Sequence, residues 1–134
     1  MNITTFDDLL AAARAQPEPQ RLLLVFAGAE PGSGPTAAQQ LAFEQGHGGE
    51  LTPLMCVDKG LDELASFAAL VEQARQAGPP WAIVFAAALS GTADAPPDSR
   101  AAEAPLQRMV DNIRSGVLGS MLSFDSTGTA VTLD

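Results

Sequence analysis

Four stretches of the chain are almost continuously apolar and predict the strands of a sheet. They cover residues 22–29, 51–57, 81–89 and 117–124, and polar, Gly or Pro residues bound them. Short apolar runs between turn-forming residues are typical of strands that are buried on both faces. Pro53 interrupts the second stretch, and because proline removes a donor from the ladder, we expect an edge position or a bulge there. The tail alternates around a D-S-T-G turn and predicts a hairpin.

Four further segments carry the signals of helices. Thr5 and Asp8 can cap the first, and Thr36 and Gln39 form the T-x-x-Q pattern of a capping box at the start of the second. Gly116 is placed to end the fourth. The predicted core-facing residues of the first, third and fourth helices are Phe6, Leu9, Leu10 and Ala13; Leu64, Phe67, Ala68, Val71 and Ala74; and Leu106, Met109, Val110 and Ile113.

The order of these elements predicts a single α/β domain over residues 1–134, with a mixed five-stranded sheet, about four helices and a C-terminal β-hairpin. Segments 22–60 and 81–128 look alike, since each runs strand, polar loop, helix, glycine, strand and aspartate. We expect each to form a βαβ unit, in which a right-handed crossover makes the two strands parallel. A true duplication and similar α/β patterning without common ancestry both remain open.

Charge and composition exclude several classes of partner. Sixteen acidic and seven basic residues give a formal net charge of -9, and the basic residues are scattered singly. Binding of nucleic acid or anionic lipid needs clustered positive charge, so neither is an expected partner. The apolar runs are too short to cross a membrane. A single cysteine excludes an internal disulfide, and the start "MNITTFDD" shows no secretory signal, so we expect a cytoplasmic protein.

The loop within "VFAGAEPGSGPTAAQQ", residues 25–40, carries the sharpest ligand-binding pattern. Gly32, Gly34 and Ala37 fit the dinucleotide-binding pattern G-x-G-x-x-A, and Asp58 follows at the distance of a ribose-binding acid. The glycines would let the backbone approach a pyrophosphate, and the amides at the helix start after Thr36 would bind it. The pattern departs from that motif, because Ala-Glu-Pro separates the strand from the first glycine and the glutamate opposes an anion. A connecting loop that leads into a capped helix is the favoured interpretation.

Parallel strands would bring the ends of several strands to one side of the sheet, where α/β sheets usually hold ligands. The residues predicted to meet there and bind a ligand are Gly32, Gly34, Thr36, Asp58, Ser90, Gly91 and Thr92. We predict no catalytic residues, no metal ligands and no cofactor.

Other chemistry-bearing residues have structural interpretations. His47 is the only histidine and has no second metal ligand beside it, and Cys56 lies in an apolar stretch, as expected of a buried core residue. The pairs Asp7–Asp8 and Asp62–Glu63 each fall at an expected helix start, where negative charge is favourable. Trp81 either anchors an interface or covers one end of the core. The nucleophile-elbow and C-x-x-C patterns are absent.

Five segments together resemble, over nearly the whole chain, a family of short uncharacterised proteobacterial proteins. They are "TFDDLLAAARAQPEPQRLL", "LTPLMCVDKG", "ELASFAALV", "PLQRMV" and the final hairpin. Members of that family often carry the label "ribonucleotide reductase subunit alpha". Large reductase subunits are several times longer and need multiple cysteines, whereas this chain has one, so the label does not carry over. The resemblance implies no functional residues.

The sequence favours a noncatalytic, acidic module that associates with itself, as a homodimer, or with another protein. We expect the contact to use an exposed sheet edge, with the last hairpin as the candidate, or an apolar helix face. The alternative is a small-ligand or nucleotide-binding protein that uses the loops at the carboxyl ends of the strands. An enzyme is the third interpretation, and it would use a cofactor supplied by a partner chain.

Overall fold

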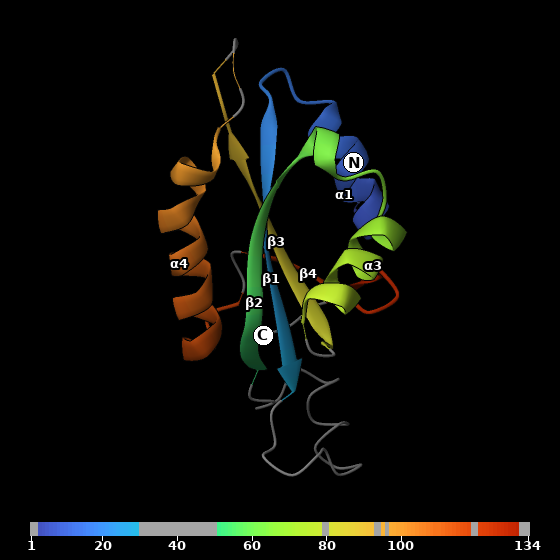
Figure 1. Ribbon diagram of the computed structural model, residues 1–134, viewed down its shortest axis with the longest axis vertical. Helices are drawn as coiled ribbons and strands as arrows, with labels where there is room; N and C mark the ends of the chain where they lie inside the picture. The colour runs from blue at the N-terminus through green and yellow to red at the C-terminus, as the bar shows by residue number, and fades with distance from the viewer. Residues whose placement is uncertain are drawn as a thin grey trace.

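The computed structural model describes residues 3–29, 51–78, 81–92, 95, 97–118 and 121–131, and it shows one α/β domain with three layers (Figure 1). A five-stranded antiparallel sheet forms the middle layer. Helices α1 and α3 cover one face of the sheet, and α4 covers the other. In chain order the elements are α1 (Phe6–Arg14), β1 (Gln20–Ala29), β2 (Leu51–Gly60), the 3-10 helix η1 (Leu61–Glu63), α3 (Phe67–Ala77), β3 (Ile83–Ser90), α4 (Ser99–Ser115), β4 (Leu122–Asp125) and β5 (Ala130–Val131).

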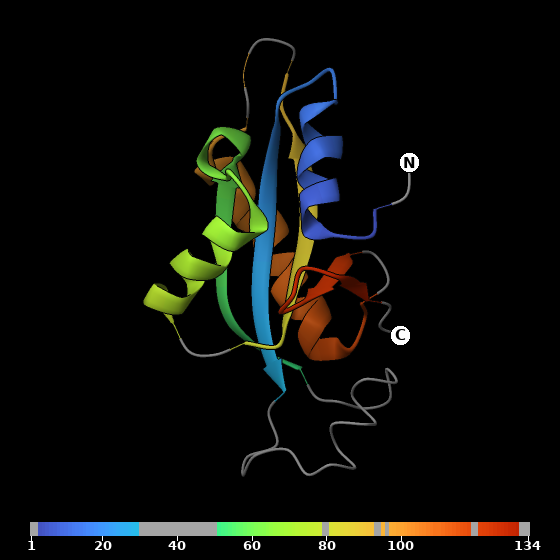
Figure 2. The same ribbon diagram turned by 90° about the vertical axis from the view of Figure 1, so that its right-hand side faces the viewer.

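The strands lie in the order β2-β1-β3-β4-β5, and every neighbouring pair is antiparallel. The expected mixed sheet with parallel βαβ units is therefore wrong for the described strands. β1 lies between β2 and β3, which run parallel to each other without touching (Figure 2). The connection through η1 and α3 thus skips over β1. A pattern of apolar residues does not reveal this, because it says which segments are strands and not which strands are neighbours.

The predicted strands agree with the structure to different degrees. Segments 22–29 and 51–57 lie within β1 and β2, and β3 begins two residues later than the segment 81–89. Only the last part of segment 117–124 belongs to β4. The expectation for Pro53 is confirmed, because β2 is an edge strand and its pairing with β1 shifts register between Phe26 and Ala27. The helix predicted to begin at Thr36 lies outside the described residues.

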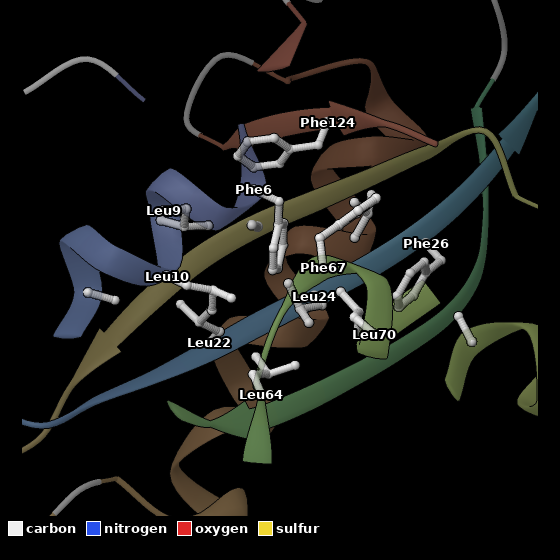
Figure 3. Packing of buried hydrophobic residues seen from close by; sticks show 14 residues of the cluster. Phe6, Leu9, Leu10, Leu22, Leu24, Phe26, Leu64, Phe67, Leu70 and Phe124 are labelled. Carbon is white, nitrogen blue, oxygen red and sulfur yellow. The ribbon is translucent and has the colours of Figure 1, made fainter. Parts of the chain in front are cut away.

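Strand β1 contributes to two cores, because its side chains alternate between the faces of the sheet. Leu22, Leu24 and Phe26 pack against α1 and α3, and Leu23 and Val25 pack against α4. All five are at most 2% exposed, as predicted for a strand buried on both faces. Figure 3 shows the first core, in which aromatic and leucine side chains from α1 and α3 pack against side chains of β1 and β4.

Both explanations for the likeness of segments 22–60 and 81–128, a duplication and similar patterning without common ancestry, stay open. The alignment behind this likeness equates Leu24 with Ile83, and these two residues lie on opposite faces of the sheet. If β1 and β3 were equivalent strands of a duplication, a twofold axis perpendicular to the sheet would relate them. Such an axis places equivalent residues on the same face of the sheet. The similarity of the two segments therefore does not extend to their packing in this alignment.

Two predicted helices have the expected ends and buried faces. Thr5 and Asp8 form the capping box of α1, and α4 ends at Gly116, which has a left-handed φ of 77°. The buried residues of α1 are Phe6, Leu9, Leu10 and Ala13, as predicted. In α4, Val110 is only partly buried, and Ala102 joins the predicted Leu106, Met109 and Ile113 in the core.

Helix α3 differs from its prediction in its start and in its buried face. It begins at Phe67, after an N-cap at Ser66. Leu64 is buried but precedes the helix, and Leu70 is buried where the prediction named Ala68, which is exposed. The pair Asp62–Glu63 lies in η1, at its start, where the Glu63 carboxylate accepts a hydrogen bond from the Gly60 amide at 2.8 Å. The helical periodicity of this segment therefore predicts a start for α3 that lies too early in the chain.

The segment before α1 closes against the turn between β4 and β5. The Phe6 amide donates to the Gly128 carbonyl, and the Ala130 amide donates to the Thr4 carbonyl, each at 2.8 Å. Asp125 stabilises the turn by accepting hydrogen bonds from the amides of Thr127 and Thr129. The last hairpin, predicted to offer an uncovered edge, is thus engaged by the chain itself. The prediction of an uncovered edge at this hairpin is wrong. The sequence contains no signal that residues 3–5 lie beside β5 and the turn before it.

Candidate functional site

The predicted ligand site depended on parallel strands, whereas the described strands are antiparallel. Asp58 and Ser90 do lie near the same end, since Asp58 is paired with Leu23 and Ser90 with Gln20. The carboxyl end of β1 lies at the opposite end of the sheet, where Ala29 is paired with Leu51. The loop with Gly32, Gly34 and Thr36, which follows that end, is outside the described residues. One shared site for all seven residues therefore stays a prediction, without the parallel strands on which it was based.

A compact polar cluster does form at the end of the sheet that holds Asp58. The guanidinium of Arg21, on β1, approaches Oδ2 of Asp58, on β2, at 2.6 Å through both Nε and Nη2. The Ser99 hydroxyl, at the start of α4, donates to the same oxygen at 2.6 Å and accepts a hydrogen bond from Arg21 at 2.9 Å. Glu63 of η1 lies 3.8 Å from the guanidinium. Four elements therefore meet around one arginine.

Sheet geometry explains why these side chains meet. Arg21 and Leu23 point to the α4 face of β1, and Asp58 is the cross-strand partner of Leu23 on that face. Helix α4 lies over β1 and β2, which brings its first residue, Ser99, above the pair. The Arg21 and Asp58 side chains are only 14% and 19% exposed, so water screens the ion pair less than it would on an open surface.

The electrostatics of the cluster keep Asp58 charged. Burial acts to raise the pKa of Asp58, but hydrogen bonds from Ser99 and Arg21, together with the Arg21 charge, outweigh burial and hold this pKa below its usual range. A carboxylate with a lowered pKa is a weak proton acceptor, so it does not activate the Ser99 hydroxyl as a nucleophile. The described residues include no histidine that could take that role. The geometry is that of a structural clasp between β1, β2 and α4.

The other predicted ligand-binding residues at this end also make structural bonds. The Ser90 hydroxyl accepts a hydrogen bond from the Gln20 amide nitrogen at 2.9 Å. The Gly91 backbone amide donates to the Pro19 carbonyl, and Thr92 forms an isolated bridge with Ala95. No buried side-chain nitrogen or oxygen among the described residues lacks a hydrogen-bond partner. The bonds of Ser90, Gly91 and Thr92 that the structure describes therefore join neighbouring segments of the chain.

Sequence reasoning missed Gln20 and Arg21. Gln20 is only 6% exposed, and Arg21 opens the apolar run of β1. Two polar residues at the start of a strand that is buried on both faces were an available signal of this polar cluster. Buried polar side chains need hydrogen-bond partners, which neighbouring elements must supply.

Cys56 is exposed, and its prediction as a buried core residue is wrong. Its neighbours Met55 and Val57 pack against the α1 and α3 core from the other face of β2. Alternation along the strand turns Cys56 away from them, and β2 is an edge strand with one side open. An apolar run looks the same in sequence whether one or both of its faces are covered.

Trp81 packs against the first core, which confirms its interpretation as a core residue. Its ring makes edge-on contacts with Phe26 and Phe67, at centroid distances of 5.0 and 6.4 Å. The side chain is partly buried. His47 lies outside the described residues.

The chain matches no protein-family model, and neither the curated proteins nor the solved structures include a significant match. Within the described residues, no three side chains of His, Cys, Asp or Glu gather closely enough to hold a metal ion. None of the helices that the structure describes has the length and apolar character needed to cross a bilayer.

Proposed function

We propose that this protein is a noncatalytic interaction module that associates with itself or with another protein along the outer edge of β2. The observation that carries the proposal is the position of β2, a ten-residue strand at the edge of the sheet. No described strand pairs with its outer side (Figure 2). A long edge strand offers a row of backbone donors and acceptors to an incoming strand.

The opposite edge of the sheet supports the choice of β2. Strand β5 has two residues, and the segment at Thr4 and Thr5 bonds to it and to the adjacent turn. Short and covered edges are a common protection against unwanted pairing. Of the two edges in the described sheet, β2 is the longer one, and among its amides Gly60 is bonded to the Glu63 carboxylate.

Features of β2 itself limit where a partner strand can lie. Pro53 has no amide hydrogen, and the register shift opposite it disturbs the strand locally. Residues 55–60 pair regularly with β1 and form the undisturbed part. Cys56, which is exposed, lies in this part. A partner strand would therefore run beside residues 55–60.

The state of the polar cluster supports a noncatalytic role. Arg21, Asp58 and Ser99 satisfy one another, and the lowered pKa of Asp58 makes it a poor general base. The expected cytoplasmic location stays a prediction and agrees with an exposed free thiol, which oxidising compartments rarely leave unpaired.

The self-association arm is tested by placing opposite charges on the β2 edge. Light scattering after size-exclusion chromatography would measure the mass of Cys56→Lys, of Cys56→Glu and of their equimolar mixture. If two copies pair along β2, each variant alone is weakened by like charges, and the mixture regains the mass of the dimer. Ser126→Lys and Ser126→Glu are matched controls, because Ser126 is exposed in the turn between β4 and β5, at the opposite edge of the sheet.

A heterologous partner is tested by affinity capture with the wild type and with the two Cys56 variants. The proposal expects a partner that the wild type and the Ser126 variants retain and that the Cys56 variants lose. A strict monomer at high concentration, together with capture of no partner, would contradict the proposed function.

A further inference from the structure

The two parts of α4 are anchored to the sheet in different ways. Within residues 99–105, Ala102 is the one fully buried residue, and five of the seven are exposed. The remainder of the helix buries Leu106, Met109 and Ile113. Because apolar stabilisation grows with the area removed from water, one methyl group holds the first part far more weakly than three large side chains hold the second.

Pro105 marks the junction between these parts. It lies inside the helix, seven residues from its start. Proline has no amide hydrogen, so the helical bond from residue 105 to the Ala101 carbonyl is missing, and the proline ring crowds that carbonyl. Interior prolines are a recognised cause of helix kinks. The hydrogen-bond ladder is thus weakest where the anchoring changes.

Ser99 supplies the polar attachment of the first part. Its hydroxyl donates to Asp58 and accepts from Arg21, which joins α4 to both β2 and β1. The cap at Asp98, by contrast, is local, since its carboxylate accepts from the Ala101 amide at 2.8 Å. Among the described side-chain hydrogen bonds of α4, those of Ser99 are the ones that reach the sheet.

We propose that residues 99–105 form a latch, which opens from the sheet while residues 106–115 stay packed, and which Ser99 holds closed on the Arg21–Asp58 pair. Local openings of this kind need less free energy than global unfolding, and they occur where few apolar contacts hold a segment. When the latch opens, the Arg21–Asp58 ion pair near the carboxyl end of β2 loses its hydrogen bonds to Ser99. The inference does not depend on the proposed function, although both concern the same strand.

Amide hydrogen exchange of the intact chain, read at single residues by NMR, tests the latch. In Ser99→Ala, we expect exchange of the amides of residues 103 and 104 to rise by at least about 10- to 100-fold. This factor corresponds to the loss of one hydrogen bond to a charged group, and Ser99 makes two such bonds. The amides of residues 110–115 should keep their wild-type rates. Ser115→Ala is the matched control, because the Ser115 hydroxyl bonds only to the Asp111 carbonyl at the other end of α4.

Pro105→Ala tests the junction. It restores an amide donor at residue 105, so the two parts of α4 should open together and the added exchange in Ser99→Ala should largely disappear in the double variant. Equal acceleration along the whole of α4 in Ser99→Ala, or no acceleration at residues 103 and 104, would refute the latch. A double variant that exchanges as fast as Ser99→Ala would refute the junction at Pro105 and, with it, the separate opening.

Discussion

Replacing Gly128 by alanine should destabilise the protein through two separate effects. Gly128 has a φ of 86°, in the left-handed region, and a Cβ there would lie 2.8 Å from Cδ2 of Phe67. Gly116, at the end of α4, has a similar φ of 77° but nothing within 4 Å of an added Cβ. Gly116→Ala therefore imposes the backbone strain alone, and the two variants form a matched pair.

The structure gives a magnitude for each effect. An alanine in the left-handed region costs about 1–2 kcal/mol. The Phe67 ring has little freedom to retreat, since its centroid lies 5.4 Å from that of Phe6 and 6.4 Å from that of Trp81. Overpacking of a core typically costs about 1–3 kcal/mol more. We expect a loss of about 2–5 kcal/mol in the free energy of unfolding for Gly128→Ala, and about 1–2 kcal/mol for Gly116→Ala.

Urea unfolding followed by Trp81 fluorescence measures both losses on one scale. The single tryptophan packs on Phe67, so its signal reports the core that the added methyl group would disturb. The difference between the two variants, about 1–3 kcal/mol, is the part due to the Phe67 contact. Equal losses in the two variants would show that the turn does not press on α3, and the reasoning would be wrong.

Two further predictions concern β2. The pKa of Asp58 is lowered in the folded state, so its contribution to stability is complete above its unfolded pKa of about 3.9 and is lost as the pH falls through the lower folded value. Asp58→Asn should cost about 1–3 kcal/mol at pH 7 and flatten the fall in stability below about pH 4 in acid titrations, and an unchanged slope would contradict the ion pair. At a concentration low enough to keep the protein monomeric, Cys56 should react fully with a thiol reagent such as Ellman's reagent, at a rate near that in urea. Protection of the thiol under these conditions would show that another part of the chain covers the middle of β2.

The sequence predicted local structure well where one signal was sufficient. The Thr5–Asp8 capping box and the face of α1 follow from spacing alone, and so does the end of α4 at Gly116. Pro53 correctly indicated an edge strand with an irregular register. In each case the signal is a property of a few neighbouring residues, and no distant contact overrides it.

Short-range signals in the sequence did not reveal which strands are neighbours or which residues form the polar cluster. Parallel and antiparallel arrangements of β1 and β2 bury the same residues, so the apolar pattern does not distinguish them. The clasp joins Arg21, Asp58 and Ser99, which are 37 to 78 residues apart in sequence. Only the order of the strands brings these residues together, and the prediction of that order was wrong. The exposed position of Cys56 was missed for the same reason, because it depends on which side of β2 has a neighbour.

The bonds between Thr4 to Phe6 and Gly128 to Ala130 bear on how the chain is made. A ribosome releases residues 4–6 early and residues 128–130 much later, so α1 cannot adopt its final place while most of the chain is still being synthesised. At about 5–20 residues per second, this leaves a delay of several seconds to half a minute. Throughout that time Phe6 lacks Phe124, its edge-on neighbour, and nascent chains should be most vulnerable to aggregation and proteolysis at the start of α1.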